Sequence, residues 1–392
     1  MKTSPFVHRA TAVVIGLGLS WAILRSTAAQ ETDRTKPAPS NVRGSAYPRI
    51  HPDRRVTFRV KAPQAQSVAV AGRAEDSGMN GNKPYPMIRG TNGDWTVTTD
   101  PVRPGFHYYE LIVDGYHTTD PASESFFGWG QATSGLEVPD ETLDFYRPAD
   151  VPHGEVRIHW YASKITGVTR QAYIYTPPGY EASPTNRYPV LYLQHGAGES
   201  ERAWTWQGKA NWILDNLLAD GKAKPMIVVM ENGYAARASE TAPGQARGNA
   251  AFAELVISDL VPQIDSNFRT LPDRDHRAIA GLSMGAGQAL AIGLGNLDKF
   301  AYVGAFSGGM RNVEVRSAYG GLFQDSAAAN RQIRLLWLGC GTEDRGYASL
   351  KAAHEALQGL GVHHVWFEGP GSHEWQVWRK HLFDFVPRLF QN

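Results

Sequence analysis

Apolar residues follow two different patterns along the chain, and the change between them falls near residue 150. Between residues 48 and 144, short runs alternate apolar and polar positions and are separated by Gly, Pro, Asn and Asp. Alternation with period two places every second side chain on one face of a strand, so this part predicts an all-β sandwich. The expected strands are 56–60, 67–72, 95–99 and 106–115, the last of which closes the set.

After residue 150, continuous apolar runs alternate with stretches of helical spacing. The first two runs, 153–160 and 170–176, are predicted to form an antiparallel pair of strands. Strands that alternate with helices indicate a doubly wound α/β sheet, so we expect an α/β domain at 150–392 behind a sandwich domain at 48–145. The runs that predict buried parallel strands are 188–194, 226–230, 277–282, 301–307, 334–340 and 365–367. The predicted helices are 212–218, 250–267 and 348–360.

The run 277–282 leads into Gly281-Leu282-Ser283-Met284-Gly285, and a helix of small residues follows. A G-x-S-x-G sequence between a strand and a helix is typical of a nucleophile elbow, whose strained turn projects the serine from the sheet. The flanking glycines let the strand and the helix pass closely. Together with the α/β pattern, the elbow predicts an α/β-hydrolase fold with Ser283 as the nucleophile.

The acid and the histidine of such a site follow the serine along the chain. Asp344 lies in the turn after the strand predicted at 334–340, and spacing alone leaves the adjacent Glu343 as an alternative. His373 lies in a late loop before the C-terminal helix, whereas the other late histidines fall within or beside predicted helices and strands. The predicted triad is therefore Ser283, His373 as general base and Asp344 as the group that orients it.

The oxyanion of an ester hydrolysis needs two N–H donors. We expect one from Met284, directly after the nucleophile, and one from Ala197, in the glycine-rich turn that follows the first parallel strand. His195 in the same turn is expected to organise the loop rather than to exchange protons.

Composition narrows the classes of function. The net charge of +1 over 392 residues gives no electrostatic reason to expect nucleic acid or a membrane surface as partner. His-x-x-x-His, paired cysteines and a P-loop are absent from the sequence, so we expect no metal and no cofactor. With Cys340 as the single cysteine, an internal disulfide is excluded.

Residues 1–29 have the pattern of a signal peptide, with a basic start, an apolar run at 10–24 and small residues before a cleavage site near Ala29. An uncleaved anchor is the alternative, although the run is short for a membrane span. Residues 30–47 are polar and contain proline, which predicts a flexible linker. The protein is expected to be secreted or periplasmic, with no membrane segment in its mature form.

Ordered motifs in both halves resemble known families. Those in the second half are Tyr175-Thr176-Pro177-Pro178-Gly179-Tyr180, His195-Gly196, Gly281-Leu282-Ser283-Met284-Gly285, Cys340-Gly341-Thr342-Glu343-Asp344 and Ser372-His373-Glu374-Trp375. Across residues 170–380 the chain is similar to carbohydrate esterase family 1, which contains feruloyl and acetylxylan esterases and has enterochelin esterases as relatives. Family members with a Cys-Gly-Thr-x-Asp turn use the final Asp as the triad acid, so the resemblance implies Asp344.

Residues 50–122, from Phe58-Arg59-Val60-Lys61-Ala62-Pro63 to Asp120-Pro121, resemble the glycogen-binding-like carbohydrate-binding modules (CBM48), which are immunoglobulin-like sandwiches. We expect the aromatic residues Trp95, Tyr108 and Tyr109 to belong to the core of this sandwich rather than to a sugar platform. The aromatics of 126–130, after the last expected strand, are expected either to pack on the second domain or to line its cleft.

The resemblance implies a secreted serine esterase that removes ferulate or related hydroxycinnamates from plant xylan. Its expected partner is a feruloylated or acetylated plant polysaccharide or oligosaccharide. The expected substrate contacts are Trp204, Trp206, Trp375 and Trp129. An acetylxylan esterase and an enterochelin-type esterase are the alternatives within enzymes. A glycan-binding protein with an inactive hydrolase domain is a further alternative, against which the intact triad positions argue.

Overall fold

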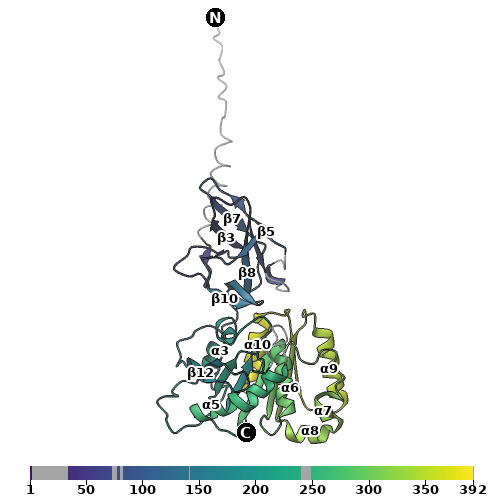
Figure 1. Cartoon of the computed structure of the whole chain (residues 1–392). Helices are drawn as coiled ribbons and strands as arrows, with labels where there is room; N and C mark the ends of the chain where they lie inside the picture. The colour runs from purple at the N-terminus through teal and green to yellow at the C-terminus, as the bar shows by residue number, and fades with distance from the viewer. Residues whose placement is uncertain (2–33, 73–76, 80–82, 141, 240–248, 392) are drawn as a thin grey trace.

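A computed structural model of the protein describes residue 1 and residues 34–72, 77–79, 83–140, 142–239 and 249–391. The described chain forms a β-sandwich domain and a larger α/β domain, which lie one above the other in Figure 1. Apart from Met1, the expected signal peptide lies outside the described residues.

Two antiparallel sheets form the first domain, with strand orders β1-β2-β3-β7-β6 and β10-β11-β8-β4-β5, and β9 pairs with β8. Alternate side chains of the strands fill the space between the sheets, where Trp95 and Tyr109 are buried as expected. The strands are β1 Lys36–Pro37, β2 Arg49–Ile50, β3 Val56–Lys61, β4 Val68–Gly72, β5 Tyr85–Pro86, β6 Ile88–Arg89, β7 Asp94–Thr98, β8 Gly105–Val113, β9 Tyr116–Thr118, β10 Ser125–Gly128 and β11 Gln131–Val138.

Two segments of this domain differ from the expectation. The described part of the segment expected to be a linker runs along the sandwich: β1 pairs with β2, and Ala38 is buried in the core and donates its N–H to Pro48 O. The strands also continue beyond residue 115, because β10 and β11 form a hairpin and β11 pairs with β8. The aromatic segment 126–130 therefore lies in this hairpin rather than after the last strand.

An eight-stranded sheet, in the order β12-β13-β15-β14-β16-β17-β18-β19, is the centre of the second domain. The pairs β12–β13 and β13–β15 are antiparallel, and all other neighbours are parallel. The strands are β12 Glu155–Ala162, β13 Thr169–Thr176, β14 Val190–Gln194, β15 Ile227–Glu231, β16 Arg277–Leu282, β17 Tyr302–Phe306, β18 Leu335–Gly341 and β19 Val365–Gly369.

Helices cover both faces of this sheet, so its central strands are buried on both sides. In β14, for example, Tyr192 belongs to the core on the side of α4, α5, α6 and α9, while Leu191 and Leu193 belong to the core on the side of α3 and α10. The helices are α2 Ala203–Trp206, α3 Ala210–Ala219, α4 Asn249–Leu255, the π-helical turn η2 Val256–Leu260, α5 Val261–Asn267, α6 Met284–Gly295, α7 Ala318–Gly321, α8 Ser326–Gln332, α9 Tyr347–Gly359 and α10 Trp375–Phe385.

One hydrophobic cluster spans the interface between the two domains. Phe106, Tyr108 and Phe126 of the sandwich belong to the same buried cluster as the inner residues of α3 and α10. In Figure 1, β10 and the end of β8 lie directly above these two helices. The interface also contains an ion pair: the guanidinium of Arg379, which is fully buried, contacts both carboxylate oxygens of Glu137 at 2.8 and 2.9 Å.

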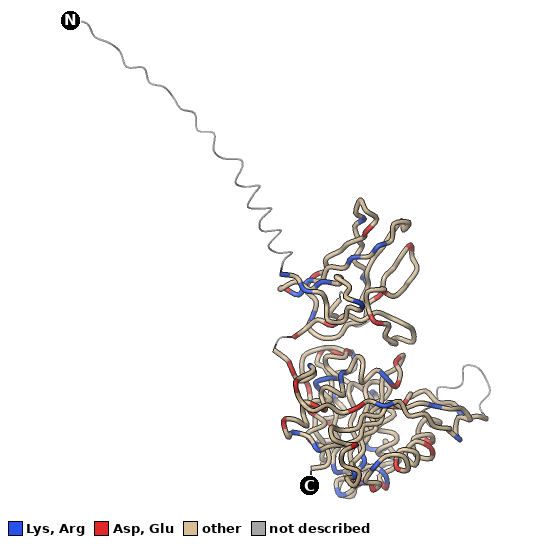
Figure 2. The backbone as a smooth tube through the Cα atoms, turned by 90° about the vertical axis from the view of Figure 1, so that its left-hand side faces the viewer, with Lys and Arg blue, Asp and Glu red and all other residues tan. Residues whose placement is uncertain are grey.

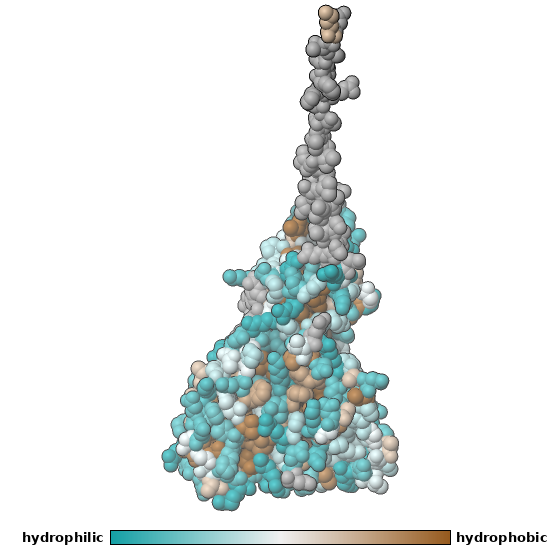
Figure 3. All heavy atoms as spheres, turned by 180° about the vertical axis from the view of Figure 1, so that it is seen from behind, coloured by the Kyte–Doolittle hydropathy of each residue, from teal (hydrophilic) through white to brown (hydrophobic). Residues whose placement is uncertain are grey.

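Charged residues of both signs are interspersed over the two domains, as Figure 2 shows for the backbone tube. On the face shown in Figure 3, apolar patches are separated by polar residues. Within the part of the chain that the structure describes, no helix is both long enough and apolar enough to cross a membrane.

Glu137→Gln is expected to lower the free energy of unfolding by about 3–5 kcal/mol, because it leaves the buried Arg379 guanidinium without a counter-charge. Urea-induced unfolding followed by tryptophan fluorescence measures the change. Lys222→Met is the control, since the Lys222–Asp220 pair is more than half exposed and such pairs contribute about 0–1 kcal/mol. Equal losses of stability in the two variants would contradict the role given to the buried pair.

Candidate active site

Ser283 occupies a strained turn between β16 and α6. Its backbone has φ 52° and ψ −111°, a left-handed conformation that L-residues rarely adopt. The turn closes so tightly that a Cβ added to Gly281 would lie 2.5 Å from Gly285 O. A Cβ on Gly308 would likewise lie 2.5 Å from Ser283 O. The sequence therefore needs glycine around the serine, and the turn lifts the serine side chain above the end of the sheet.

The structure brings Ser283, His373 and Asp344 together in a single chain of hydrogen bonds. His373 Nε2 lies 2.9 Å from Ser283 Oγ, and His373 Nδ1 lies 2.6 Å from Asp344 Oδ2. Glu343, the alternative acid, points elsewhere and forms an ion pair of 2.8 Å with Arg103 of the first domain. Asp344 is thus the carboxylate that contacts the histidine.

The surroundings of Asp344 keep it ionised. Burial on its own would raise the pKa of this carboxyl, but the hydrogen bonds from His373 and from the Gly346 N–H outweigh burial and lower the pKa below its ordinary value. Arg311, whose Nη2 lies 3.7 Å from Asp344 Oδ1, acts in the same direction. An ionised Asp344 can only accept a hydrogen bond, here from Nδ1–H, so this contact favours the His373 tautomer whose Nε2 can accept the Ser283 proton.

Two backbone N–H groups expected to bind an oxyanion border the serine. Met284 is the first residue of α6, where an N–H has no acceptor within the helix. Ala197 lies in the loop after β14, and this loop approaches the serine so closely that a Cβ on Gly196 would lie 3.6 Å from Ser283 Cβ. Ala197 lines the cavity that contains Ser283.

His195 organises this loop from a buried position. Its Nε2 lies 2.9 Å from the Gly233 N, so it accepts a hydrogen bond there, and its Nδ1 lies 2.8 Å from Gly196 O and donates. Burial lowers the pKa of His195 to about 4, which keeps the ring neutral and maintains this pattern. The imidazole is therefore committed to backbone groups rather than to proton exchange.

Glu199 links the loop to the first domain. One carboxylate oxygen accepts the Gly196 N–H at 3.0 Å, and the other accepts the Tyr108 hydroxyl at 3.1 Å. The Tyr108 oxygen in turn accepts N–H groups from Gln207 at 2.8 Å and Trp375 at 3.2 Å, so its own proton is directed to Glu199. Burial raises the pKa of Glu199 to about 7.

The tip of the β10–β11 hairpin makes a second contact with the loop. Trp129 and Gly130 form its two-residue turn with φ 57° and 79°, the signs of a type I′ turn. The Gly130 N–H donates to Gly198 O at 2.8 Å, and a Cβ on Gly198 would lie 2.8 Å from Trp129 Cα. The Tyr108 side chain and the Gly130 backbone of the sandwich thus both contribute to fixing the loop that carries Ala197.

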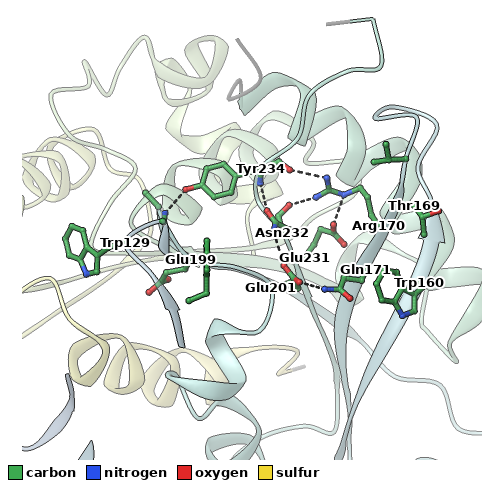
Figure 4. Close-up of a pocket in the computed structure, with 15 residues that line it drawn as sticks. Trp129, Trp160, Thr169, Arg170, Gln171, Glu199, Glu201, Glu231, Asn232 and Tyr234 are labelled. Atoms are coloured by element: carbon green, nitrogen blue, oxygen red, sulfur yellow. Dashed lines mark hydrogen bonds and ion pairs between the residues drawn. The ribbon is translucent and has the colours of Figure 1, made fainter. Parts of the chain in front are cut away.

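Two cavities adjoin this loop. The smaller, of about 120 Å³, contains Ser283 and His373 and has a largely aromatic wall. The larger, of about 1010 Å³, is the open groove of Figure 4. Trp129, Ala197 and Glu199 line both cavities, which places the two spaces side by side at the expected oxyanion loop. The aromatic residues around the smaller cavity are Phe106, Tyr108, Trp129, Trp375 and Trp378.

Of the four tryptophans that were expected to contact substrate, two line the cavity that contains Ser283 and two do not. Trp375 and Trp129 line the serine cavity. Trp204 does not: it is buried in the core and donates Nε1–H to Gln194 O at 2.9 Å. Trp206 also lines neither cavity, because it packs against Phe126 and under Arg202. Trp204 is therefore a core residue, and Trp206 is partly buried against the cluster between the two domains.

Three aromatic residues of the serine cavity were not expected from the sequence. Phe106 and Tyr108 lie on one face of β8 because they are two positions apart, and this face meets the second domain. Trp378 follows Trp375 by three positions on α10, a helical spacing that places both on one side. Among the described residues, no three His, Cys, Asp or Glu side chains gather as ligands for a metal ion.

Residues 163–389, more than half of the chain, match the family model described as "Putative esterase". An endo-1,4-beta-xylanase/feruloyl esterase of Xylanibacter ruminicola is 37% identical over 361 residues, which are 91% of this chain and 47% of that protein. Endo-1,4-beta-xylanase Y of Acetivibrio thermocellus is 24% identical over 307 residues, which are 71% of this chain and 27% of that protein. The chain therefore spans less than half the length of these two curated relatives.

Solved structures agree on the fold. A CE1 ferulic acid esterase of the anaerobic fungus Anaeromyces mucronatus is 30% identical, with a TM-score of 0.54, and covers 63% of this chain and 96% of its own. The enterobactin esterase of Shigella flexneri has a TM-score of 0.63 over 86% of this chain and 93% of its own; at 20% identity this likeness shows the fold alone. The expected α/β-hydrolase fold behind an all-β domain is confirmed.

Glu199→Gln is expected to change how stability depends on pH. Between the ordinary pKa of 4.5 and the raised pKa of about 7, the folded protein holds a proton that the unfolded chain has released. Wild-type stability therefore falls as the pH rises from about 4.5 through 7, and the variant lacks this loss.

The free energy of unfolding of both proteins is measured at about pH 5 and about pH 8. Between these two pH values, the stability of Glu199→Gln relative to wild type should rise by up to about 3 kcal/mol. A stability difference between the two proteins that is the same at both pH values would contradict a buried Glu199 with a raised pKa.

Proposed function

Because the chain belongs to the "Putative esterase" family of carboxylic ester hydrolases, we propose that it is a feruloyl esterase that releases hydroxycinnamates from plant xylan. The observation that carries the proposal is the contact of 2.9 Å between Ser283 Oγ and His373 Nε2 inside an aromatic cavity. The similarity to the Xylanibacter ruminicola endo-1,4-beta-xylanase/feruloyl esterase, which extends over both domains, supports this substrate.

In the proposed mechanism, His373 Nε2 accepts the proton of Ser283 as Oγ attacks the ester carbonyl. The N–H groups of Met284 and Ala197 stabilise the oxyanion, and Asp344 stabilises the imidazolium. His373 then returns the proton to the departing alcohol oxygen of the sugar, leaving an acyl group on Ser283. A water molecule gives its proton to His373 and attacks the acyl group, which frees the acid and restores Ser283.

The shape of the smaller cavity suits a planar aromatic acid. Its aromatic walls offer flat apolar faces against which an aromatic ring can pack. An acetyl group would leave most of these faces without contact. This difference favours a hydroxycinnamate over acetate as the acyl group.

The sandwich is proposed to be a module of the CBM48 type that has become part of the catalytic site. Its resemblance in sequence supports the family, whereas Trp95, Tyr108 and Tyr109 are too deeply buried to offer a sugar-stacking surface. We also propose export to the periplasm or the medium after cleavage near Ala29, which N-terminal sequencing of the exported protein tests.

Wild type is expected to hydrolyse methyl ferulate and methyl sinapate, and Ser283→Ala should lower kcat by at least about 10⁴-fold, since the nucleophile is lost. Acetylated xylan and a catechol siderophore ester, assayed beside them, test the alternatives. Turnover of acetylated xylan alone would make the protein an acetylxylan esterase, and turnover of the siderophore ester alone an enterochelin-type esterase. Binding of xylan with no turnover of any ester would support a glycan-binding protein.

Asp344→Asn is expected to lower kcat by about 10³–10⁴-fold, because an amide no longer favours the productive tautomer of His373. Glu343→Gln is the matched control: the two acids are adjacent, but Glu343 pairs with Arg103 at the surface, so kcat should stay within about twofold. Steady-state kinetics on methyl ferulate measure both. A larger loss in Glu343→Gln would contradict the assignment of the triad acid.

A further inference from the structure

The larger cavity is an open groove with an exposed tryptophan at each end. Trp129, 47% exposed, comes from the hairpin of the sandwich, and Trp160, 62% exposed, comes from the edge strand β12 (Figure 4). Single exposed apolar side chains are common on protein surfaces, but large ones that line the same groove often mark a binding site. The groove therefore has two apolar platforms that the proposed chemistry at Ser283 does not use together.

The floor between the two tryptophans consists of polar side chains that hold one another in place. Glu201 accepts N–H groups from Gln171 at 2.5 Å and Asn232 at 3.0 Å, and Arg170 Nε lies 2.8 Å from Glu231 Oε1 (Figure 4). Such fixed donors and acceptors favour a ligand with many hydroxyl groups, because little ordering is needed on binding. They disfavour an apolar helix, which would take polar groups out of water without offering them any further hydrogen bond.

The charge of the groove argues against an anionic ligand. Glu199, Glu201 and Glu231 line it together with a single guanidinium, that of Arg170. Sugar rings have apolar C–H faces that pack on an indole and hydroxyl rims that form hydrogen bonds. A neutral carbohydrate chain meets each of these requirements.

We propose that this groove binds the neutral oligosaccharide that carries the ester, with Trp129 and Trp160 stacking on its sugar rings. The inference rests on the proposed esterase function. Because Trp129, Ala197 and Glu199 line both cavities, an ester held at Ser283 can place its acid in the smaller cavity and extend its sugar into the groove. An open groove of about 1010 Å³ accepts an internal stretch of a chain as well as its end.

Trp160→Ala tests the proposal with two substrates that share the acid. For a feruloylated xylo-oligosaccharide, kcat/KM should fall about tenfold, mainly through KM, whereas for methyl ferulate it should stay within about twofold. Ile158→Ala is the matched control, because Ile158 lies on the same face of β12 and is 51% exposed but does not line the groove. This control should leave both substrates unaffected.

Equal effects of Trp160→Ala on the two substrates would overturn the groove proposal while leaving the esterase function intact, whereas a wild type inactive on both would overturn the function itself. Titration of Ser283→Ala with unesterified xylo-oligosaccharide supplies a readout independent of catalysis. Heat of binding that Trp160→Ala abolishes is expected. Equal binding by Ser283→Ala with or without Trp160 would overturn the assignment of that platform.

Discussion

The left-handed backbone of Ser283 is the constraint on which the rest of the site depends. A non-glycine residue held at positive φ costs on the order of 1–3 kcal/mol, so the surrounding structure must enforce it. Here the Ser283 N–H donates to Phe306 O at 2.9 Å, and glycine positions allow the neighbouring segments to close in. This conformation places the Ser283 side chain above the end of the sheet, where it faces His373, with the first turn of α6 behind it.

Close packing of the backbone also explains why the sandwich contributes to the site. The loop that carries Ala197 has few side chains of its own to fix it, because glycines flank that residue on both sides. Its rigidity comes from Glu199 and, through that carboxylate, from Tyr108 of the other domain. The hydrophobic cluster that spans the two domains and the buried Arg379–Glu137 pair keep Tyr108 in position to contact Glu199.

Local patterns predicted the parts of the protein that depend on local chemistry. The elbow, the late His373 loop and the buried strands were readable because spacing and apolar runs determine them. Trp204 was misjudged because proximity along the chain to the oxyanion loop does not reveal which way an indole points. The β11 strand was missed because the Ala and Gly residues within it favour strands weakly, and its pairing with distant β8 supplies the stability. Spacing alone left Glu343 open, and the structure separates the two acids because Asp344 contacts His373 whereas Glu343 pairs with Arg103.

The contact between Gly198 and the Trp129–Gly130 turn has a consequence for how this architecture evolves. The backbone of one domain fills the space where any side chain at Gly198 would lie, so the two positions cannot drift independently. Exchanging the sandwich for another module, even one of the same family, would fit only if the replacement carried a turn of the same length and twist. This contact therefore couples the two domains at the level of the backbone, although they look like separable modules.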